Sequence, residues 1–377
     1  MSRLFWLLFV FASVIFLAHY YIVGNAVWGD GRYYYVYTRS AIIDHDLDFS
    51  NESQTHPFFF ESNQTSAGKL FNKYTIGAPL LWTPWFLLAH FLNPAPNPDG
   101  YQHLYRILVG LGCVFYAQLG LYLSYLTVAK ITSPKKALIS WLSLFLATNI
   151  FFYSAVDPIN SHSAGIFISS LIFYLWFRWK HSLNQSSVII LGLLTGLLAM
   201  IRLQDIIFCL PLLIYLYNQS RFSHIFTYLL GIIIGFSPQL IVWQLLLGKI
   251  ANPYSLNQET FYWLRPQILS VLISNNNGLF YYSPLFILAV IGLLKKFKQS
   301  VWAKVGLTLF ILQTYIISSW HGWWGGASFG ARMFLSLTPY FMLGLAWFLS
   351  KNIKIYRFIF LFTVLNFSQI LYLLLTN

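Results

Sequence analysis

The chain has 377 residues, of which 58% are hydrophobic, 20% are aromatic and only 9% are charged. A soluble chain carries roughly a quarter of its residues as charges, so too few charges are present here to solvate a globule of this size. This composition excludes a soluble enzyme, a disordered chain and a disulfide scaffold. It predicts an all-α polytopic membrane protein, with residues 1–377 forming a single transmembrane domain.

The net charge of +13 comes from small basic groups that recur between apolar runs. This spacing is typical of cytoplasmic loops and does not indicate a nucleic-acid partner. Cys113 and Cys209 lie inside apolar runs, where packed thiols are expected rather than a disulfide. The first apolar run follows Arg3 and no signal-cleavage site comes after it, so we expect it to be retained as a helix.

Apolar runs long enough to cross a bilayer recur along the whole chain. Eleven are expected to cross: 4–24, 103–128, 137–152, 164–177, 188–201, 206–217, 225–247, 278–294, 305–319, 333–349 and 358–375. A further run, 76–92, is interrupted by Pro79 and Pro84. We expect this run to be a membrane-surface helix, because letting it cross would move the basic group 130–136 to the outer face.

Charges sort by side when the N-terminus is placed in the cytoplasm. The inner segments then hold 14 basic and no acidic residues, while all ten acidic residues, Glu61 among them, lie outside. The positive-inside rule counts only Lys and Arg, so the sorting of the acids supports the orientation independently. The outer face carries two long loops, 25–75 and 248–277. Because long loops on rigid scaffolds usually carry function, we expect the active face there.

The first loop opens with Asp30 between two glycines, followed by a run of tyrosines that includes Tyr33 and Tyr34. The glycines allow substrate or backbone to approach the carboxylate closely. A helix C-cap with an Asx turn would explain Gly29 and Asp30, but it leaves the tyrosines unexplained. Some of these tyrosines could belong to an interfacial aromatic belt.

The same loop carries three alternating carboxylates, Asp44, Asp46 and Asp48. Such a pattern can supply oxygen ligands to a divalent cation. The run lacks the glycine and the final glutamate of an EF-hand loop, and a solvated acidic turn explains it equally well. A divalent cation is therefore the one cofactor that the sequence raises.

Further polar residues occur at the predicted outer ends of the spans. Lys73 could meet a lipid phosphate or simply snorkel to the interface. Arg202 and Asp205 are one turn apart and could form an ion pair, but ionisable groups within a membrane domain more often mark a functional site. Aromatic rings there could pack on sugar rings or belong to the membrane belt. The remaining candidates are Asp157, His162, Gln204, Arg265, His321, Trp323, Trp324 and Arg332.

Together these residues resemble the GT-C superfamily of membrane glycosyltransferases. The similarity is closest to the bacterial branch related to protein O-mannosyltransferases and the aminoarabinose transferase of lipid A. It rests on Asp30 soon after the first span and on the stretch Lys73-Tyr74-Thr75-Ile76-Gly77-Ala78-Pro79-Leu80. Three features depart from the family: Gly31 replaces a second acid, Ala78-Pro79 replaces paired prolines, and no large soluble domain follows the last span.

The resemblance implies a GT-C-like bundle that transfers a sugar from a polyprenyl phosphate to an acceptor hydroxyl at the periplasmic or extracellular face. Asp30 would be the base, and Lys73, Arg202, Arg265 and Arg332 would hold the donor phosphate. The acceptor could be a protein, a lipid or a glycan, with Asp157 and His162 positioning it or a metal. A single displacement would invert the anomeric centre.

Two other classes of function compete with this hypothesis. A transporter or flippase of lipid-linked sugars is the alternative, but such proteins usually place their site at the midplane within internal repeats, and no repeat is seen here. A structural membrane protein would leave the clustered outer charges without a purpose.

Overall fold

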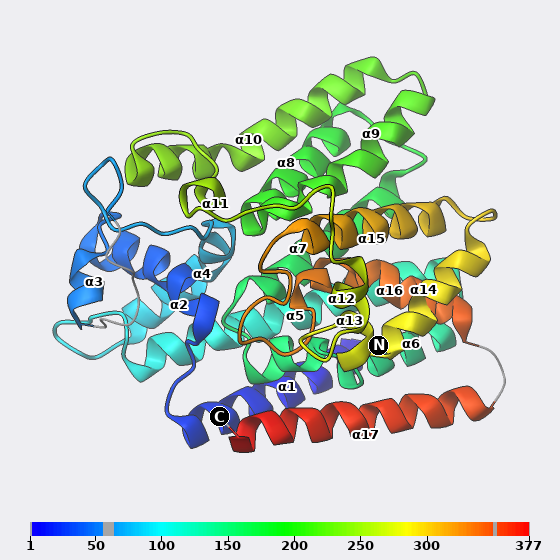
Figure 1. Ribbon diagram of the computed structural model, residues 1–377, viewed down its shortest axis with the longest axis horizontal. Coiled ribbons are helices and arrows are strands. Elements are labelled where there is room, and N and C mark those ends of the chain that lie inside the picture. The colour runs from blue at the N-terminus through cyan, green and yellow to red at the C-terminus, as the bar shows by residue number, and fades with distance from the viewer. Residues whose placement is uncertain (1, 56–63, 350–352, 377) are drawn as a thin grey trace.

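The computed structural model describes residues 2–55, 64–349 and 353–376 (Figure 1). Glu61, which belongs to the predicted first outer loop, lies outside these residues. The regular structure of the described chain is helical, and its only β-type pairings are two isolated bridges, Gln64–Leu70 and Phe261–Trp320. This confirms the prediction of an all-α protein.

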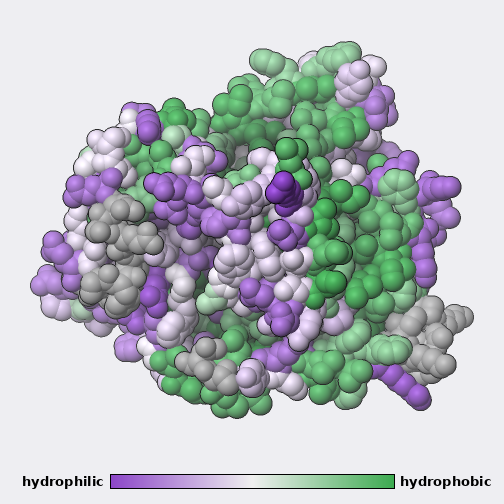
Figure 2. All heavy atoms as spheres, in the orientation of Figure 1, coloured by the Kyte–Doolittle hydropathy of each residue, from purple (hydrophilic) through white to green (hydrophobic). Residues whose placement is uncertain are grey.

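Within the described residues, five helices are long and apolar enough to cross a membrane: α1 (Ser2–Val23), α5 (His103–Ile131), α10 (Phe222–Leu247), α15 (Val301–Ser319) and α17 (Ile353–Thr376). They make this a membrane-embedded, multi-pass protein. The expected total of eleven spans is not confirmed. Figure 2 shows hydrophobic side chains over broad areas of the molecule and hydrophilic ones gathered mainly toward the centre and left of the view.

The other predicted runs fall on helices outside this set, and the chain changes helix type inside several of these runs. These helices are α6 (Pro134–Leu146), α7 (Ser161–Trp179), α8 (Gln185–Ile201), α9 (Cys209–Asn218), α14 (Leu285–Lys296) and α16 (Thr338–Phe348). Short π or 3₁₀ segments adjoin them: η2 (Phe152–Val156), η3 (Leu203–Phe208) and η4 (Arg332–Leu337). Tighter or wider turns of this kind often accompany functional sites.

The described part of the first long loop includes three helical segments. It contains α2 (Gly29–Arg39), η1 (Ser40–Asp44) and α3 (Ser50–Thr55), and α4 (Gly77–Leu92) follows it with Pro84 inside the helix. Tyr34, Tyr35 and Tyr37 of α2 are buried, so these tyrosines pack inside the protein and do not form a membrane belt. Helix α4 occupies the run predicted to lie on the membrane surface; its relation to the bilayer stays a prediction.

The second long loop runs past α11 (Pro253–Leu256) and α12 (Ile268–Ile273) to α13 (Leu279–Tyr282). It is tied to the end of α15 by the backbone, since the N–H of Tyr262 donates to the carbonyl of Ser319 at 2.6 Å and that of Gln267 to the carbonyl of Ser318 at 2.7 Å. The loop therefore has a defined position against a spanning helix.

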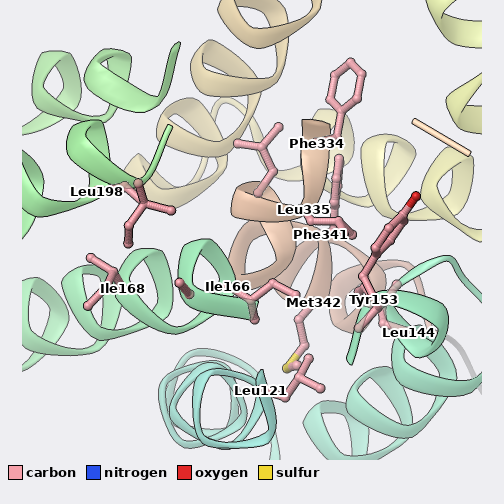
Figure 3. Close-up of a cluster of buried hydrophobic side chains, with 14 of the residues drawn as sticks. Leu121, Leu144, Tyr153, Ile166, Ile168, Leu198, Phe334, Leu335, Phe341 and Met342 are labelled. Atoms are coloured by element: carbon pink, nitrogen blue, oxygen red, sulfur yellow. The ribbon is translucent and has the colours of Figure 1, made fainter. Parts of the chain in front are cut away.

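The core joins helices from both halves of the chain. Figure 3 shows Leu121 of α5 and Ile166 of α7 near Met342 of α16, and Leu198 of α8 beside Ile168 of α7, all within one buried cluster. Helices α8 and α10 approach closely through glycine: a Cβ atom at Gly196 would lie 2.4 Å from the carbonyl oxygen of Ile232. Cys113 and Cys209 are both free thiols, which confirms the expected absence of a disulfide between them.

Candidate active site

A cavity of about 420 Å³ lies where the first loop, the second loop and the segments η3 and η4 meet. Six of the residues singled out from the sequence line it: Asp30, Tyr34, Lys73, Arg202, Gln204 and Arg332. These residues come from positions spread over 300 residues of chain. Three of them are cations and one is a carboxylate, so the lining favours an anionic ligand.

Asp30 is held by two hydrogen bonds. Its Oδ2 accepts from Nη2 of Arg332 at 2.7 Å, and its Oδ1 accepts from the hydroxyl of Tyr74, also at 2.7 Å. It lies in the first turn of α2, where the helix dipole favours a negative charge. The C-cap alternative is wrong, because α1 ends at Val23 and is followed by Gly24, which has φ +74° and donates its N–H to the carbonyl of Tyr20.

Arg332 begins η4, at the end of the glycine-rich turn. Its Nη2 also donates to the carbonyl of Gly325 at 2.9 Å. Gly325 has φ +73°, a conformation that side chains rarely adopt. Burial lowers the pKa of Arg332, but the Asp30 carboxylate, together with Tyr153, Tyr74 and Asp157, outweighs burial and raises that pKa above its ordinary value.

Lys73 pairs with a residue that the sequence did not single out. Its Nζ lies 2.6 Å from Oε1 of Glu259, whose Oε2 accepts from Nε1 of Trp320 at 2.6 Å. The Glu259 side chain is only 5% exposed. Snorkelling alone therefore does not explain Lys73: the ammonium ties the end of the first loop to the second loop and to the end of α15.

Arg202 differs from the other two cations because no carboxylate within the described part of the chain pairs with it. Its Nη1 donates to Oγ of Ser161 at 3.1 Å and lies 3.3 Å from Nδ1 of His162. Its Nε is buried and has no hydrogen-bond partner among the described residues. The ion pair with Asp205 considered from the sequence does not form. Arg202 thus keeps donor capacity for a ligand.

Asp205 instead binds neighbours in the core. Its Oδ1 accepts from Nε2 of Gln313 at 3.2 Å and its Oδ2 from Oγ of Ser336 at 2.5 Å. Gln313 also donates to the carbonyl of Met333 at 3.0 Å. Asp205 lies in η3, which begins directly after Arg202, and Met333 follows Arg332 in η4, so this network holds together the two segments that position the arginines. Gln204 adds a bond from Nε2 to the same Met333 carbonyl at 3.2 Å.

Asp157 and His162 lie behind the cavity wall and not in its lining. Burial raises the pKa of Asp157 to about 7, partly opposed by Arg332 and reinforced by Asp30. Its Oδ1 is buried without a hydrogen-bond partner among the described residues. The His162 ring packs on Tyr153, with centroids 4.8 Å apart. Asp157 thus interacts electrostatically with Arg332 and Asp30, and His162 lies beside the guanidinium of Arg202.

Several predicted residues lie elsewhere. Arg265 is exposed on the second loop, and His321, Trp323 and Trp324 do not line the cavity. Tyr33 stacks on Tyr74, with centroids 5.0 Å apart, and so contacts the site indirectly. Besides Tyr34 and Tyr74, the aromatic lining comes from residues that the sequence did not single out: Tyr254, Phe261, Trp263 and Trp320. Their only sequence signal is their place in a long outer loop or beside a span.

The carboxylates predicted as weak metal ligands have local partners. Asp44 pairs with Arg39, Asp46 accepts from Oγ of Ser40 at 2.7 Å, and Asp48 accepts from Oγ of Ser50 at 2.6 Å. Among the described residues, no three His, Cys, Asp or Glu side chains are grouped so that they could hold a metal ion. These contacts are those of a capped acidic turn, and the metal hypothesis gains no support from them.

No protein-family model and no curated protein matches the chain.

Proposed function

We propose that the protein is a glycosyltransferase that moves a sugar from a polyprenyl-phosphate donor to an acceptor hydroxyl. The observation that carries the proposal is the meeting of Asp30, Lys73, Arg202 and Arg332 at one cavity in a membrane-embedded protein. Its volume of about 420 Å³ lies in the range of small-molecule sites, roughly 300–1,000 Å³. A ligand with a charged head and a lipid tail suits a charged cavity beside spanning helices.

The leaving group of this reaction is a phosphate, and cations must balance the charge that develops on it. Arg202 is the first candidate because its Nε has no partner among the described residues. Arginine is also suited to bidentate phosphate contact. Lys73 and Arg332 would add their charges after exchanging part of their contact with Glu259 and Asp30 for contact with the phosphate.

The incoming hydroxyl needs a group that accepts its proton, a role usually worth about 10²- to 10⁴-fold in rate. Asp30 is that group in this proposal. When the phosphate engages Arg332, Oδ2 of Asp30 becomes available to the acceptor. The hydroxyl oxygen bonds to the anomeric carbon as the carbon–phosphate oxygen bond breaks, the proton passes to Asp30, and the configuration inverts.

Aromatic faces around the site suit a sugar, because the C–H faces of pyranoses pack on rings. Tyr254 and Trp320 lie on the lining with Lys73. We place the cavity on the outer face of the membrane, with the N-terminus in the cytoplasm; this orientation rests on the sorting of charges along the sequence.

The test is a transfer assay in nanodiscs with polyprenyl-phosphate sugars as donors, preceded by mass spectrometry of lipids that co-purify with the protein. We expect a bound polyprenyl-phosphate species and transfer to an added acceptor. Arg202→Gln should weaken donor binding, whereas Arg265→Gln, at an arginine outside the cavity, should not. Movement of the donor across the bilayer without any transfer would instead identify a flippase and contradict the proposal.

A further inference from the structure

The second long loop exposes an unusual series of apolar side chains. Within residues 262–273, called here the interface segment, six large apolar residues are 41% to 97% exposed: Tyr262, Trp263, Leu264, Ile268, Leu269 and Ile273. Leu264 is the most exposed of them at 97%. Contiguous apolar surface of this kind is uncommon where a protein meets water and marks a site that something covers.

The interface segment is continuous with the outward surface of a spanning helix. Along α15, the exposed apolar side chains are Val301, Ile311 and Tyr315, which share one face of the helix. The hydroxyl of Tyr315 donates to the carbonyl of Trp263 at 2.9 Å, and the two rings lie 5.8 Å apart. Figure 2 shows hydrophobic side chains gathered over the region of α12 and α15.

The composition of the segment points to lipid as the occupant. Arg265 is its one charged residue, between a Tyr-Trp-Leu run and the apolar helix α12. Tyr and Trp concentrate at membrane–water interfaces, and an exposed arginine there meets lipid phosphates. A polar stretch, Ser274 to Asn277, follows the segment. The polar stretch ends the apolar surface where the chain returns to water.

We infer that residues 262–273 lie in the membrane–water interface, with Leu264, Leu269 and Ile273 among the lipid chains and Arg265 at the head groups. The second long loop is then a flap seated in the membrane surface and is not surrounded by water alone. The position of the segment follows from α15. This helix spans the bilayer with Ile311 and Tyr315 facing lipid, and the segment is hydrogen-bonded to its end.

The flap also forms part of the cavity wall, since Phe261 and Trp263 line the cavity while Trp263 is 46% exposed. One side of the cavity therefore borders the bilayer surface. If the proposed function holds, the head of a lipid-linked donor can reach Arg202 without its chain leaving the bilayer. The placement of the flap itself does not depend on that function.

The test places a nitroxide label on single introduced cysteines, Leu264→Cys and Leu269→Cys, in nanodiscs containing anionic lipid. Asn276→Cys, at an exposed residue of the polar stretch, is the matched control. Cys113 is buried and Cys209 half-buried, so the unsubstituted protein, labelled in parallel, measures the background. Elution of each variant at the volume of the parent in detergent checks that it folds.

Collision with oxygen should exceed collision with a water-soluble nickel complex at positions 264 and 269, with the ratio reversed at position 276 and a several-fold difference between them. Equal ratios at the three positions would overturn the inference. Labels at 264 shielded from both reagents and broadened by a neighbouring label would assign the surface to a second copy of the chain, which also overturns it.

Discussion

Asp30 and Arg332 are 302 residues apart in the chain, yet their side chains meet at 2.7 Å beside the cavity. This ion pair joins the start of the first loop to the turn before the last helices. Its side chains are 28% and 14% exposed, so solvent screens it only partly.

Arg332→Gln should destabilise the protein by about 1–3 kcal/mol, because Asp30 and the Gly325 carbonyl lose a donor while partly buried. The measurement is the thermal unfolding midpoint in detergent. Asp30→Asn with Arg332→Gln should be closer to the parent than Arg332→Gln alone, since the unpaired carboxylate is then gone. Additive effects of the two substitutions would show that the pair is not coupled.

The Lys73–Glu259 pair should tie the second loop over the cavity. Glu259→Gln keeps the acceptor for Trp320 but removes the negative charge opposite Lys73. We expect faster proteolysis of the loop around Ser255 and, since Lys73 loses a competing carboxylate, tighter binding of inorganic or lipid phosphate by several-fold. Gln258→Glu, one residue away, serves as the control; unchanged phosphate affinity in Glu259→Gln would contradict a role for Lys73 in anion binding.

Asp205 should stabilise the fold through its two buried hydrogen bonds. Asp205→Ala removes the acceptor of the Ser336 hydroxyl and one of the two acceptors of Gln313, and the loss of a buried acceptor typically costs about 1–3 kcal/mol. The unfolding midpoint should therefore fall by several degrees. Asp99→Ala, at an exposed carboxylate, should change it little. An equal effect of the two substitutions would mean that the network between η3 and η4 does not hold the segments.

Glu52 predicts how stability depends on pH. Its side chain is fully buried beside Arg39 at 3.1 Å, and burial, only partly offset by Arg39, raises the pKa of Glu52 to about 7. A carboxyl whose pKa is higher in the folded state stabilises that state at low pH and loses this contribution as pH rises. The contribution of Glu52 should thus fall between pH about 4.5 and about 7.

Thermal unfolding of the parent and of Glu52→Gln across that pH range checks this prediction. The amide cannot ionise, so the difference between the two proteins should grow in favour of the variant as pH rises. A difference that is constant with pH would show that Glu52 does not titrate in this window.

The sequence predicted the helical membrane class from composition, because a chain with so few charges has no other stable setting. It also identified Asp30, Lys73, Arg202 and Arg332, since ionisable residues stand out against an apolar background. It could not tell Arg202 from Arg265: both follow apolar runs, and only tertiary packing places one in the cavity and the other on its exposed flap.

Other features were hidden for a similar reason. Glu259 is one acid in a long loop, and its partners Lys73 and Trp320 are 186 and 61 residues away. A hydrophobic run marks an apolar segment but does not show where the helix type changes. The run 206–217 was therefore predicted as one helix, whereas the 3₁₀ segment η3 extends to Phe208 before α9 begins. The spacing of the carboxylates in the turn 44–48 resembles that of a metal-binding loop. The arginine and serine partners that occupy these carboxylates in the structure cannot be recognised from that spacing.

The proposed reaction is the transfer of a sugar at this cavity, with Asp30 as the base. The most direct measurement follows release of polyprenyl phosphate and appearance of the glycosylated acceptor in nanodiscs, for the parent and for Asp30→Asn. We predict turnover in the parent, a loss of about 10²- to 10⁴-fold in the variant, and donor binding retained in both. Transfer at the parent rate by Asp30→Asn would contradict the account.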